Sequence, residues 1–517
     1  MIPLTAEEAG KALGLPVLAA PVSGVSIDTR TLQPGDLFVA LKGEHFDGHD
    51  FVEKALAAGA SGAVVARETW SGRSAGFGAR PGGDVASRAA PVYEVDDTLA
   101  ALWALARDVR RKSNAIVFAV TGSVGKTSTK DLLGAMVGRV RRLVMTAANQ
   151  NNEVGVPLTL LAVVPDTEAV VVEMGMRGRG QIAALAEVAE PDVGVITNIH
   201  PVHLELLGTL ENIAQAKAEL AAGVRQGGAV VIPAECGILQ PYVEATRCPV
   251  VRFGLQGSAC AADVRGSLRS TAGGAGHILS LWWPRGQAEI ETSYMPRHNV
   301  ENATAAAAAC YVAGLPVAEC AAGIAAARLS KGRGDVLRVP GLTIIDDTYN
   351  ANPAAVRAAV DDLVGLAGRT GGRAVAVLGD MLELGPEAER YHREIGEYAG
   401  KAGVRALWGV GELAAATVEG FQRWWGGKTK DADWTAGHVT SAEETSLVSA
   451  ALRQGDVVLF KASRSMRLET MVRRIVAERQ LAGEGRLVAG RGPTGEERLG
   501  AGQEAGEETE TGTKETR

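Results

Sequence analysis

Short apolar runs rich in β-branched residues recur through the middle of the chain, and helical stretches separate them. These runs are residues 115–120, 169–175, 193–199 and 229–233. Strands of a parallel sheet read as near-continuous apolar runs because helices cover both faces of such a sheet. The pattern therefore predicts an α/β protein with a parallel sheet at its centre.

The length of 517 residues corresponds to about three domains. Residues 1–96 predict a small α/β domain, and residues 97–335 predict a central domain that holds the parallel sheet. Strand and helix signals alternate again in residues 336–482, which predicts a second doubly wound, Rossmann-like domain. Residues 71–89 are rich in Gly, Ser and Arg and predict a surface insertion. Residues 483–517 lack aromatic side chains and predict a disordered acidic tail.

Charge and cysteine usage exclude several classes of protein. A net charge of −7 argues against a nucleic-acid binder, which is typically basic. The five cysteines are scattered without a C-x-x-C pair, which argues against a disulfide framework or a zinc site. We see no signal peptide, and no apolar run reaches the roughly 20 residues that cross a bilayer. We expect a cytoplasmic protein that does not insert into membranes.

Residues 121–127, "TGSVGKT", lie between an apolar run and a helical pattern, which is where a phosphate-binding loop is expected. Gly122 and Gly125 allow backbone N–H groups to approach phosphate oxygens. Lys126 adds a positive charge at the start of the helix, and Thr127 offers a hydroxyl to magnesium. The alternative is a glycine-rich turn with an exposed lysine. The sequence context favours a nucleotide site, although the two glycines are closer together than in the usual Gly-x-x-x-x-Gly-Lys-Thr loop.

Ionisable side chains follow the neighbouring apolar runs. Glu173 ends one run, and ligands bind at the carboxyl ends of parallel strands, so this carboxylate is a candidate magnesium ligand. The alternative is a solvated acid at a strand end. His200 and His203 follow the next run, and we expect one of them to be functional. From its surroundings in the sequence alone, we expect Lys217 to be a solvated lysine on a helix.

Several motifs together resemble the Mur ligases, the ATP-dependent amide-forming enzymes of peptidoglycan synthesis. The family's phosphate loop has the form T-G-[ST]-x-G-K-[ST], which "TGSVGKT" matches with its short glycine spacing. The stretches "DDTYNANP" at 346–353 and "VLGDMLELG" at 377–385 match the branch that joins D-alanyl-D-alanine to UDP-N-acetylmuramoyl-tripeptide. So does "VVLFKASRSMRLE", in which Ala462 stands where the branch has glycine. The D-N-P-R element of a sister ligase is not visible. The resemblance spans residues 1–480.

The resemblance implies ATP and two magnesium ions as cofactors. It implies metal binding by Thr127, Glu173, His203 and Lys217, with Lys217 carbamylated, and catalytic roles for Lys126, Glu173, His203 and Lys217. His200 falls where this branch has glycine. The implied nucleotide contacts are Gly122, Ser123, Val124, Gly125, Lys126, Thr127, Ser128, Asn302, Arg333 and Asp347.

The resemblance also implies two small-molecule partners, UDP-N-acetylmuramoyl-tripeptide and D-alanyl-D-alanine. The implied substrate contacts are Asp28, Thr29, Arg30, Asp47, Gly48, His49, Asn149, Asn151, Asn152, Tyr349, Asn350 and Asn352. Without the resemblance, the first two groups predict Asx-type turns, and the loop from Asn149 predicts a polar turn that caps a helix. We expect a monomer.

The implied reaction is amide formation through an acyl phosphate. Two alternatives stay open at this point. One is a ligase of the folylpolyglutamate synthase type with another amino-acid substrate, against which the motifs of the first domain argue. The other is a nucleotide-binding scaffold without catalysis, against which Lys126, Glu173, His203 and Lys217 argue.

Overall fold

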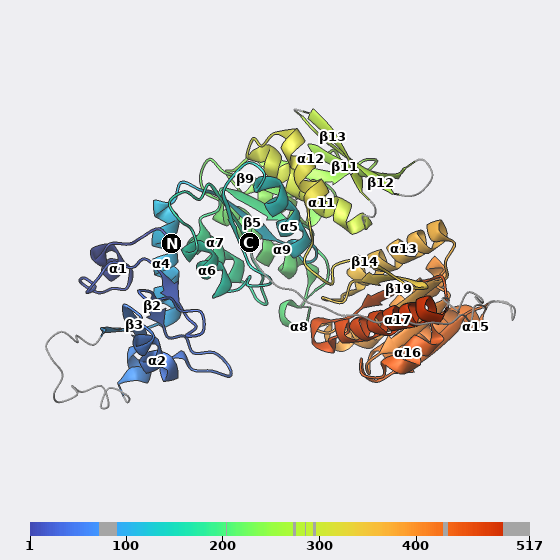
Figure 1. Ribbon diagram of the computed structural model, residues 1–517. Helices are drawn as coiled ribbons and strands as arrows, with labels where there is room; N and C mark the ends of the chain where they lie inside the picture. The colour runs from blue at the N-terminus through green and yellow to red at the C-terminus, as the bar shows by residue number, and fades with distance from the viewer. Residues whose placement is uncertain are drawn as a thin grey trace, which may run out of the picture.

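The structure is a computed structural model that describes residues 1–71, 90–202, 204–271, 276–284, 286–292, 296–427 and 433–489, with side chains up to residue 481 except that of residue 204. It contains three sheets that follow one another along the chain (Figure 1). The α/β class with parallel-sheet cores is thereby confirmed. The insertion predicted at 71–89 lies, beyond Ser71, outside the described residues.

The first sheet has four strands in the order β1-β2-β3-β4, and all its neighbours are parallel. Phe38, Val52 and Trp70 lie in a small core on one of its faces. The strands are β1 (Val25–Ser26), β2 (Leu37–Val39), β3 (Gly62–Ala66) and β4 (Val92–Val95), and the helices are α1 (Ala6–Ala12), η1 (Gly48–Phe51), α2 (Val52–Ala57) and α3 (Arg67–Trp70).

The central sheet has nine strands in the order β13-β12-β11-β10-β9-β8-β5-β7-β6. Every neighbouring pair from β6 to β11 is parallel, and β12 and β13 form an antiparallel extension. The chain leaves β5 to build β6 and β7 on one side and then adds β8 on the other, so β5 and β8 flank a topological switch point. The strands are β5 (Ile116–Thr121), β6 (Leu143–Met145), β7 (Ala169–Glu173), β8 (Val193–Ile196), β9 (Ala229–Pro233), β10 (Val250–Leu255), β11 (Val264–Ser270), β12 (His277–Trp283) and β13 (Gly286–Thr292).

Helices cover both faces of the central sheet, as the apolar runs predict. Alternate residues of β5 enter different cores: Phe118 packs on one face, and Val117 and Ala119 pack on the other. The Phe118 face carries α5 (Lys126–Val137), α11 (Arg297–Val312) and α12 (Val317–Ala326), and the opposite face carries α4 (Thr98–Lys112), α6 (Gly155–Leu161), α7 (Gln181–Ala189) and α9 (Leu210–Gly223). Shorter helices are α8 (Leu204–Leu207), η3 (Gly237–Leu239) and α10 (Gln240–Glu244).

Helix α4 connects the first sheet to the central one. Its first turn is capped by Asp97, whose carboxylate accepts hydrogen bonds from the N–H groups of Leu99 and Ala100. Leu102 and Leu105 of this helix lie in a core that also contains residues of β2 and β3. The first two sheets therefore share one apolar core.

The third sheet has six strands in the order β14-β15-β19-β16-β17-β18, and only β14 and β15 are antiparallel to each other. Helices α13, α14 and α15 cover one face, and α16 and α17 cover the other. The strands are β14 (Asp335–Val339), β15 (Leu342–Asp346), β16 (Ala374–Gly379), β17 (Ala406–Val410), β18 (Thr435–Val439) and β19 (Asp456–Lys461); the helices are α13 (Pro353–Thr370), η4 (Gly385–Glu387), α14 (Ala388–Ala402), α15 (Ala414–Gly426), α16 (Thr445–Ala451), η5 (Arg464–Met466) and α17 (Glu469–Ala489).

Helix α17 spans the predicted end of the third domain at residue 482 and continues to Ala489. Met471, Val472 and Ile475 anchor its first turns in the third core, and this helix then extends past its buried part. Residues 490–517 lie outside the described residues. No helix in the described part of the chain is both long enough and apolar enough to cross a bilayer.

Candidate active site

The loop between β5 and α5 lies at the switch point of the central sheet. Gly122 has a φ of 147° and Gly125 has a φ of 81°, which are values that side chains disfavour. A Cβ atom on Gly122 would collide with Oγ1 of Thr197, and one on Gly125 would collide with Oδ1 of Asn302. Both positions require glycine, which leaves backbone N–H groups open at the start of α5, where an anion is favoured.

Two polar residues at the end of β8 hold this loop in place. The N–H of Val124 donates to Oδ1 of Asn198 at 2.9 Å, and the carbonyl of Val124 accepts from Thr197 Oγ1 at 2.6 Å and from Asn198 Nδ2 at 3.0 Å. Ser123 Oγ donates to the carbonyl of His200 and accepts from its N–H, both at 2.9 Å. Thr197 and Asn198 were not among the predicted site residues, although a polar pair directly after an apolar strand was visible in the sequence.

The side chains of Lys126, which is half-buried, and of Lys217, which is buried, meet at the loop. Lys126 Nζ and Lys217 Nζ donate to the carbonyl of Gly122 at 2.9 and 3.0 Å. Burial lowers the pKa of Lys126 and lowers the pKa of Lys217 well below its usual value, and the charge of Lys126 lowers the pKa of Lys217 further. Lys217 is therefore not the solvated helix lysine that its surroundings in the sequence suggest.

Glu173 is the acid whose charge opposes that of Lys126. Its side chain is 1% exposed, and its Oε1 accepts from Asn151 Nδ2 at 2.7 Å, while its Oε2 is buried without a hydrogen-bond partner. Arg333 adds a further positive charge near Lys126. Positive charge thus exceeds negative charge in this buried place, which suits a phosphate-bearing ligand.

The donor set fits a magnesium ion that also binds phosphate. In the described part of the chain no three His, Cys, Asp or Glu residues form a group that could hold a metal on their own. Magnesium is typically held by one or two carboxylates together with substrate phosphates and water. Oε2 of Glu173 and the hydroxyl of Thr127 are oxygen atoms of the required kind, and His203 lies outside the described residues.

Helix α11 and the segment before β14 complete the site. Asn302 Oδ1 accepts from Thr129 Oγ1 at 3.3 Å, and its Nδ2 donates to Asn299 Oδ1 at 3.0 Å. Arg333 donates to Thr127 Oγ1 at 2.8 Å and lies 3.8 Å from the centre of the Tyr349 ring. The structure thus brings Gly122, Ser123, Val124, Gly125, Lys126, Thr127, Ser128, Glu173, Lys217, Asn302 and Arg333 to one edge of the central sheet.

Asp347, also predicted to contact the nucleotide, lies in the third unit and has its own partner. Its Oδ2 accepts from Lys461 Nζ at 2.6 Å, and Lys461 also donates to the carbonyl of Asn350 at 2.9 Å. Lys461 is 3% exposed and was not predicted. Lys461 lies at the carboxyl end of β19, and a lysine at the end of an apolar run was the feature that could have indicated it.

The residues predicted to bind the UDP substrate lie in the first unit and form the turns that the sequence alone predicts. Asp28 accepts from the N–H of Arg30 at 2.9 Å and pairs with its guanidinium at 2.6 Å, which lowers the pKa of Asp28 to about 2. Asp47 accepts from the N–H of His49 at 3.0 Å. The buried ring of His49 accepts from the N–H of Ala66 at Nε2, so the proton of a neutral ring lies on Nδ1, 2.6 Å from Asp47. Thr29 and Gly48 lie in the same two turns.

The predicted asparagines have structural partners. Asn152 Oδ1 accepts from the N–H of Gly155 at 3.0 Å at the start of α6, and Asn352 Oδ1 accepts from the N–H of Ala355 at 3.0 Å at the start of α13. Asn151 binds Glu173, as described above. Their contacts with substrate, like those of Asn149, Tyr349 and Asn350, stay predictions.

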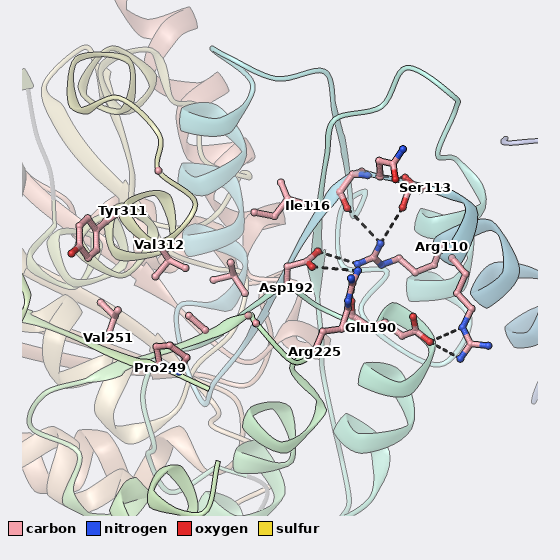
Figure 2. Close-up of a pocket in the computed structure, with 18 residues that line it drawn as sticks. Arg110, Ser113, Ile116, Glu190, Asp192, Arg225, Pro249, Val251, Tyr311 and Val312 are labelled. Atoms are coloured by element: carbon pink, nitrogen blue, oxygen red, sulfur yellow. Dashed lines mark hydrogen bonds and ion pairs between the residues drawn. The ribbon is translucent and has the colours of Figure 1, made fainter. Parts of the chain in front are cut away.

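A cavity of about 910 Å³ opens at the opposite edge of the central sheet, near the amino ends of its strands (Figure 2). Its arginines already have partners. Arg110 donates to the carbonyls of Ala189 and Glu190 and to Asp192, and Arg111 pairs with Glu190. This cavity is therefore held by internal ion pairs and lies away from the phosphate loop.

Family models match all three units of the chain. They are the Mur ligase family, catalytic domain (residues 21–110), the Mur ligase middle domain (residues 120–310) and the Mur ligase, glutamate ligase domain (residues 332–464). A UDP-N-acetylmuramoyl-tripeptide--D-alanyl-D-alanine ligase of Bacillus subtilis is 36% identical over 459 residues, which are 88% of this chain and 93% of the relative. The chain belongs to the Mur ligase family. It is a ligase.

Solved Mur ligase structures have the same fold. MurF from Acinetobacter baumannii is 28% identical with a TM-score of 0.77 and covers 92% of this chain and 99% of its own. MurF ligase from Thermotoga maritima, solved in complex with ADP, is 27% identical with a TM-score of 0.73 and covers 89% of this chain and 98% of its own.

Proposed function

We propose that this Mur ligase joins D-alanyl-D-alanine to UDP-N-acetylmuramoyl-tripeptide and converts ATP to ADP and phosphate, as the name of the Bacillus subtilis relative states for that protein. The observation that carries the proposal is the cluster of Lys126, Lys217 and Arg333 around the phosphate loop, whose positive charge is opposed by the buried Glu173. The relative's match along all three units supports the choice of substrates.

The positive charges of this cluster reduce the electrostatic repulsion between the two anionic substrates of the reaction. A carboxylate oxygen of the tripeptide attacks the γ-phosphorus of ATP, and ADP leaves, which gives an acyl phosphate. Two anions repel each other as they approach, so catalysis consists mainly of positioning and neutralisation of charge. Lys126 lies at the loop that receives the phosphates, and the guanidinium of Arg333 reaches the same place from the third unit's side.

The second step forms the amide bond. The amine of D-alanyl-D-alanine attacks the acyl carbon, phosphate leaves, and the amine loses a proton. An acyl phosphate must be shielded from water, so the third unit, which carries Tyr349, Asn350 and Asn352, has to lie over the phosphate loop. The contact of Arg333 with both Thr127 and Tyr349 supports such an approach.

We assign magnesium binding to Thr127, Glu173 and His203. The metal supplies charge neutralisation at the phosphates. Glu173 offers a buried, unpaired Oε2, and Asn151 fixes the other oxygen of the same carboxylate. Lys126 places its own charge beside that carboxylate.

We also assign carbamylation to Lys217, which would contribute to a second magnesium site. A carbamate forms when a neutral amine attacks carbon dioxide and loses a proton. Burial and the charge of Lys126 lower the pKa of Lys217 and so favour the neutral amine over the ammonium form. The negative carbamate would also remove the repulsion between the two lysines.

We place the UDP substrate against the first unit, at Asp28, Thr29, Arg30, Asp47, Gly48, His49 and the loop of Asn149, Asn151 and Asn152. The exposed guanidinium of Arg30 supports this placement because it offers a charge to a diphosphate. We propose domains at 1–96, 97–335 and 336–482, a monomer, and action in the cytoplasm. The five free thiols support a reducing compartment.

A coupled assay of ADP release tests the proposal. We expect release that requires UDP-N-acetylmuramoyl-tripeptide and D-alanyl-D-alanine together, and little release with other UDP-muramoyl peptides or with single D-amino acids. Lys126→Ala should abolish this release. Full turnover by Lys126→Ala, or equal activity with a pteroate-type acceptor, would contradict the proposal.

A further inference from the structure

Lys130 is a buried lysine of α5 to which none of the roles above applies. Its side chain is 2% exposed, and its Nζ lies 3.0 Å from Oδ1 of Asp131. The same Nζ donates to the carbonyls of Thr146 at 3.1 Å and of Ala148 at 3.5 Å. Burial of an ion pair is costly, and an apolar side chain of similar size is often at least as stabilising in such a place. The charge therefore calls for an explanation beyond stability.

The two carbonyls belong to residues 146–152, which we call the asparagine loop. Ala148 has a φ of 48°, which is a strained conformation for a residue with a side chain. A strained turn persists only when its surroundings hold it. Lys130 holds this turn through its hydrogen bonds to the carbonyl of Ala148, the strained residue, and to that of Thr146, two residues earlier.

The asparagine loop also holds Glu173. Thr146 Oγ1 accepts from the N–H of Glu173 at 3.1 Å, and Asn151 Nδ2 donates to Oε1 of Glu173 at 2.7 Å. The carbonyl of Asn151 accepts from the N–H of Gly175 at 2.7 Å. The position of the Glu173 carboxylate thus depends on the shape of the loop that Lys130 fixes.

The partner of Lys130 continues this network toward the third unit. Oδ2 of Asp131 accepts from the N–H of Ser330 at 2.8 Å and from its hydroxyl at 2.7 Å. Ser330 lies three residues before Arg333 in the segment that leads to β14. Lys130 and Asp131, which lie one turn of α5 beyond Lys126, therefore connect the asparagine loop to the segment that carries Arg333.

We propose that Lys130 is a positioning residue for the ligation reaction. It holds the asparagine loop in the conformation in which Asn151 orients Glu173 and in which Asn149 faces the UDP substrate. The predicted effect on binding of the UDP substrate rests on the proposed function. The predicted effect on the position of Glu173 does not depend on which carboxylic acid the enzyme uses as its substrate.

The variants Lys130→Met, Lys130→Gln and Lys130→Arg test the proposal, with Lys112→Met as a control at an exposed ion pair far from the loop. Lys130→Met removes the charge at nearly constant volume. Lys130→Gln keeps a donor for one carbonyl, and Lys130→Arg keeps the charge. Each protein is measured for KM of ATP and of UDP-N-acetylmuramoyl-tripeptide, and for Mn²⁺ affinity in the presence of ADP by electron paramagnetic resonance.

For Lys130→Met we expect at least a tenfold rise in KM for the UDP substrate, at least fivefold weaker Mn²⁺ binding, and a KM for ATP within threefold of the wild type. Lys130→Arg should recover most of both losses, and Lys112→Met should show neither. If Lys130→Met does not fold, Lys130→Gln must show the same split between the two KM values. Unchanged Mn²⁺ binding, or losses that only follow the fraction of folded protein, would overturn the proposal. A wild type inactive on the UDP substrate would refute the proposed function alone, since Mn²⁺ binding still reports on Lys130.

Discussion

The guanidinium of Arg333 donates a hydrogen bond of 2.8 Å to the hydroxyl of Thr127, although 206 residues separate the two in sequence. Thr127 lies in the first turn of α5, and Arg333 lies just before β14. The same guanidinium lies over the ring of Tyr349, which follows β15. One side chain therefore contacts both the phosphate loop and the third unit, so we expect nucleotide binding and the approach of the third unit to be coupled.

Arg333→Met should weaken the use of ATP. A hydrogen bond from a charged group contributes about 1.5 to 3 kcal/mol, so we expect KM for ATP to rise about tenfold or more. The KM for the UDP substrate should change little because its proposed contacts lie in the first unit. Steady-state kinetics with one substrate varied at a time provide the measurement. Arg338→Met, at an exposed position of β14, is the control, and an equal effect of both variants would show that Arg333 has no special role.

Gly125→Ala should disrupt the phosphate loop. The φ of 81° and the overlap of a Cβ atom with Asn302 both oppose a side chain, and such strain costs about 1 to 3 kcal/mol. We expect ADP binding at least tenfold weaker by calorimetry. Gly426→Ala is a matched control, since a Cβ atom there meets nothing within 4 Å. Normal ADP binding by Gly125→Ala would mean that phosphates do not contact this loop.

Lys217→Met should stabilise the ligand-free protein while removing activity. An unpaired buried charge lowers the stability of the folded protein, and an apolar side chain of similar size carries no such cost. Because the folded-state pKa of Lys217 is lowered, the unfolded chain holds a proton that the folded protein lacks between that pKa and the usual lysine pKa of 10.5. The stability of the wild type therefore rises with pH between these two pKa values. Below the folded-state pKa the protein bears the full free-energy cost of a protonated, buried Lys217.

The measurement is the urea midpoint of carbon dioxide-free protein at pH 7 and pH 10. The variant should have the higher midpoint at pH 7, and the difference should shrink toward pH 10. A wild type and a variant with the same dependence on pH would contradict the buried, proton-poor state of Lys217. Lys112→Met controls for the loss of a lysine charge at the surface.

Arg30→Met should impair the UDP substrate selectively. The guanidinium of Arg30 is 83% exposed and is held by Asp28, so it is oriented and still accessible. We expect KM for the UDP substrate to rise about tenfold, in line with the loss of one charged hydrogen bond, and KM for ATP to stay constant. Arg67→Met, an exposed arginine of the same unit that pairs with Asp96, should leave both constants unchanged. A rise in KM for ATP instead would place Arg30 near the nucleotide.

The stability contribution of Asp28 has its own dependence on pH. Its folded-state pKa is lowered to about 2, so its contribution is present above the unfolded value of 3.8 and is lost as pH falls toward 2. Both side chains are accessible to solvent, so the effect on stability should be small. Arg30→Met should therefore change the urea midpoint little at pH 7.

The sequence predicted the parts of the site that carry their own chemical signature. Lys126 and Thr127 follow a glycine-rich turn after an apolar strand, and Glu173 ends another strand. Their convergence follows from parallel topology because the carboxyl ends of neighbouring strands share one edge. Lys217 could be assigned only through the family resemblance, since on a helix its burial is invisible in the sequence.

Residues whose role depends on a partner far away in the sequence could not be predicted from the sequence. Thr197 and Asn198 hold the phosphate loop across the switch point, which requires that β8 be placed beside β5. Lys130 and Lys461 read as ordinary lysines until their burial is known. The antiparallel strands β12 and β13 were also missed, and the alternating polar residues of β13 lack the continuous apolar signal of the parallel strands.

The order in which the central sheet is assembled has a consequence for the synthesis of this protein. Strand β5 emerges from the ribosome with the phosphate loop attached, but its neighbours β7 and β8 follow later, and Asn302 and Arg333 later still. A nascent chain that ends before Asn302 has the glycine loop without either of these two side chains. If these residues bind the nucleotide as proposed, we expect nucleotide capture to wait until most of the polypeptide exists, so that truncated translation products do not sequester ATP.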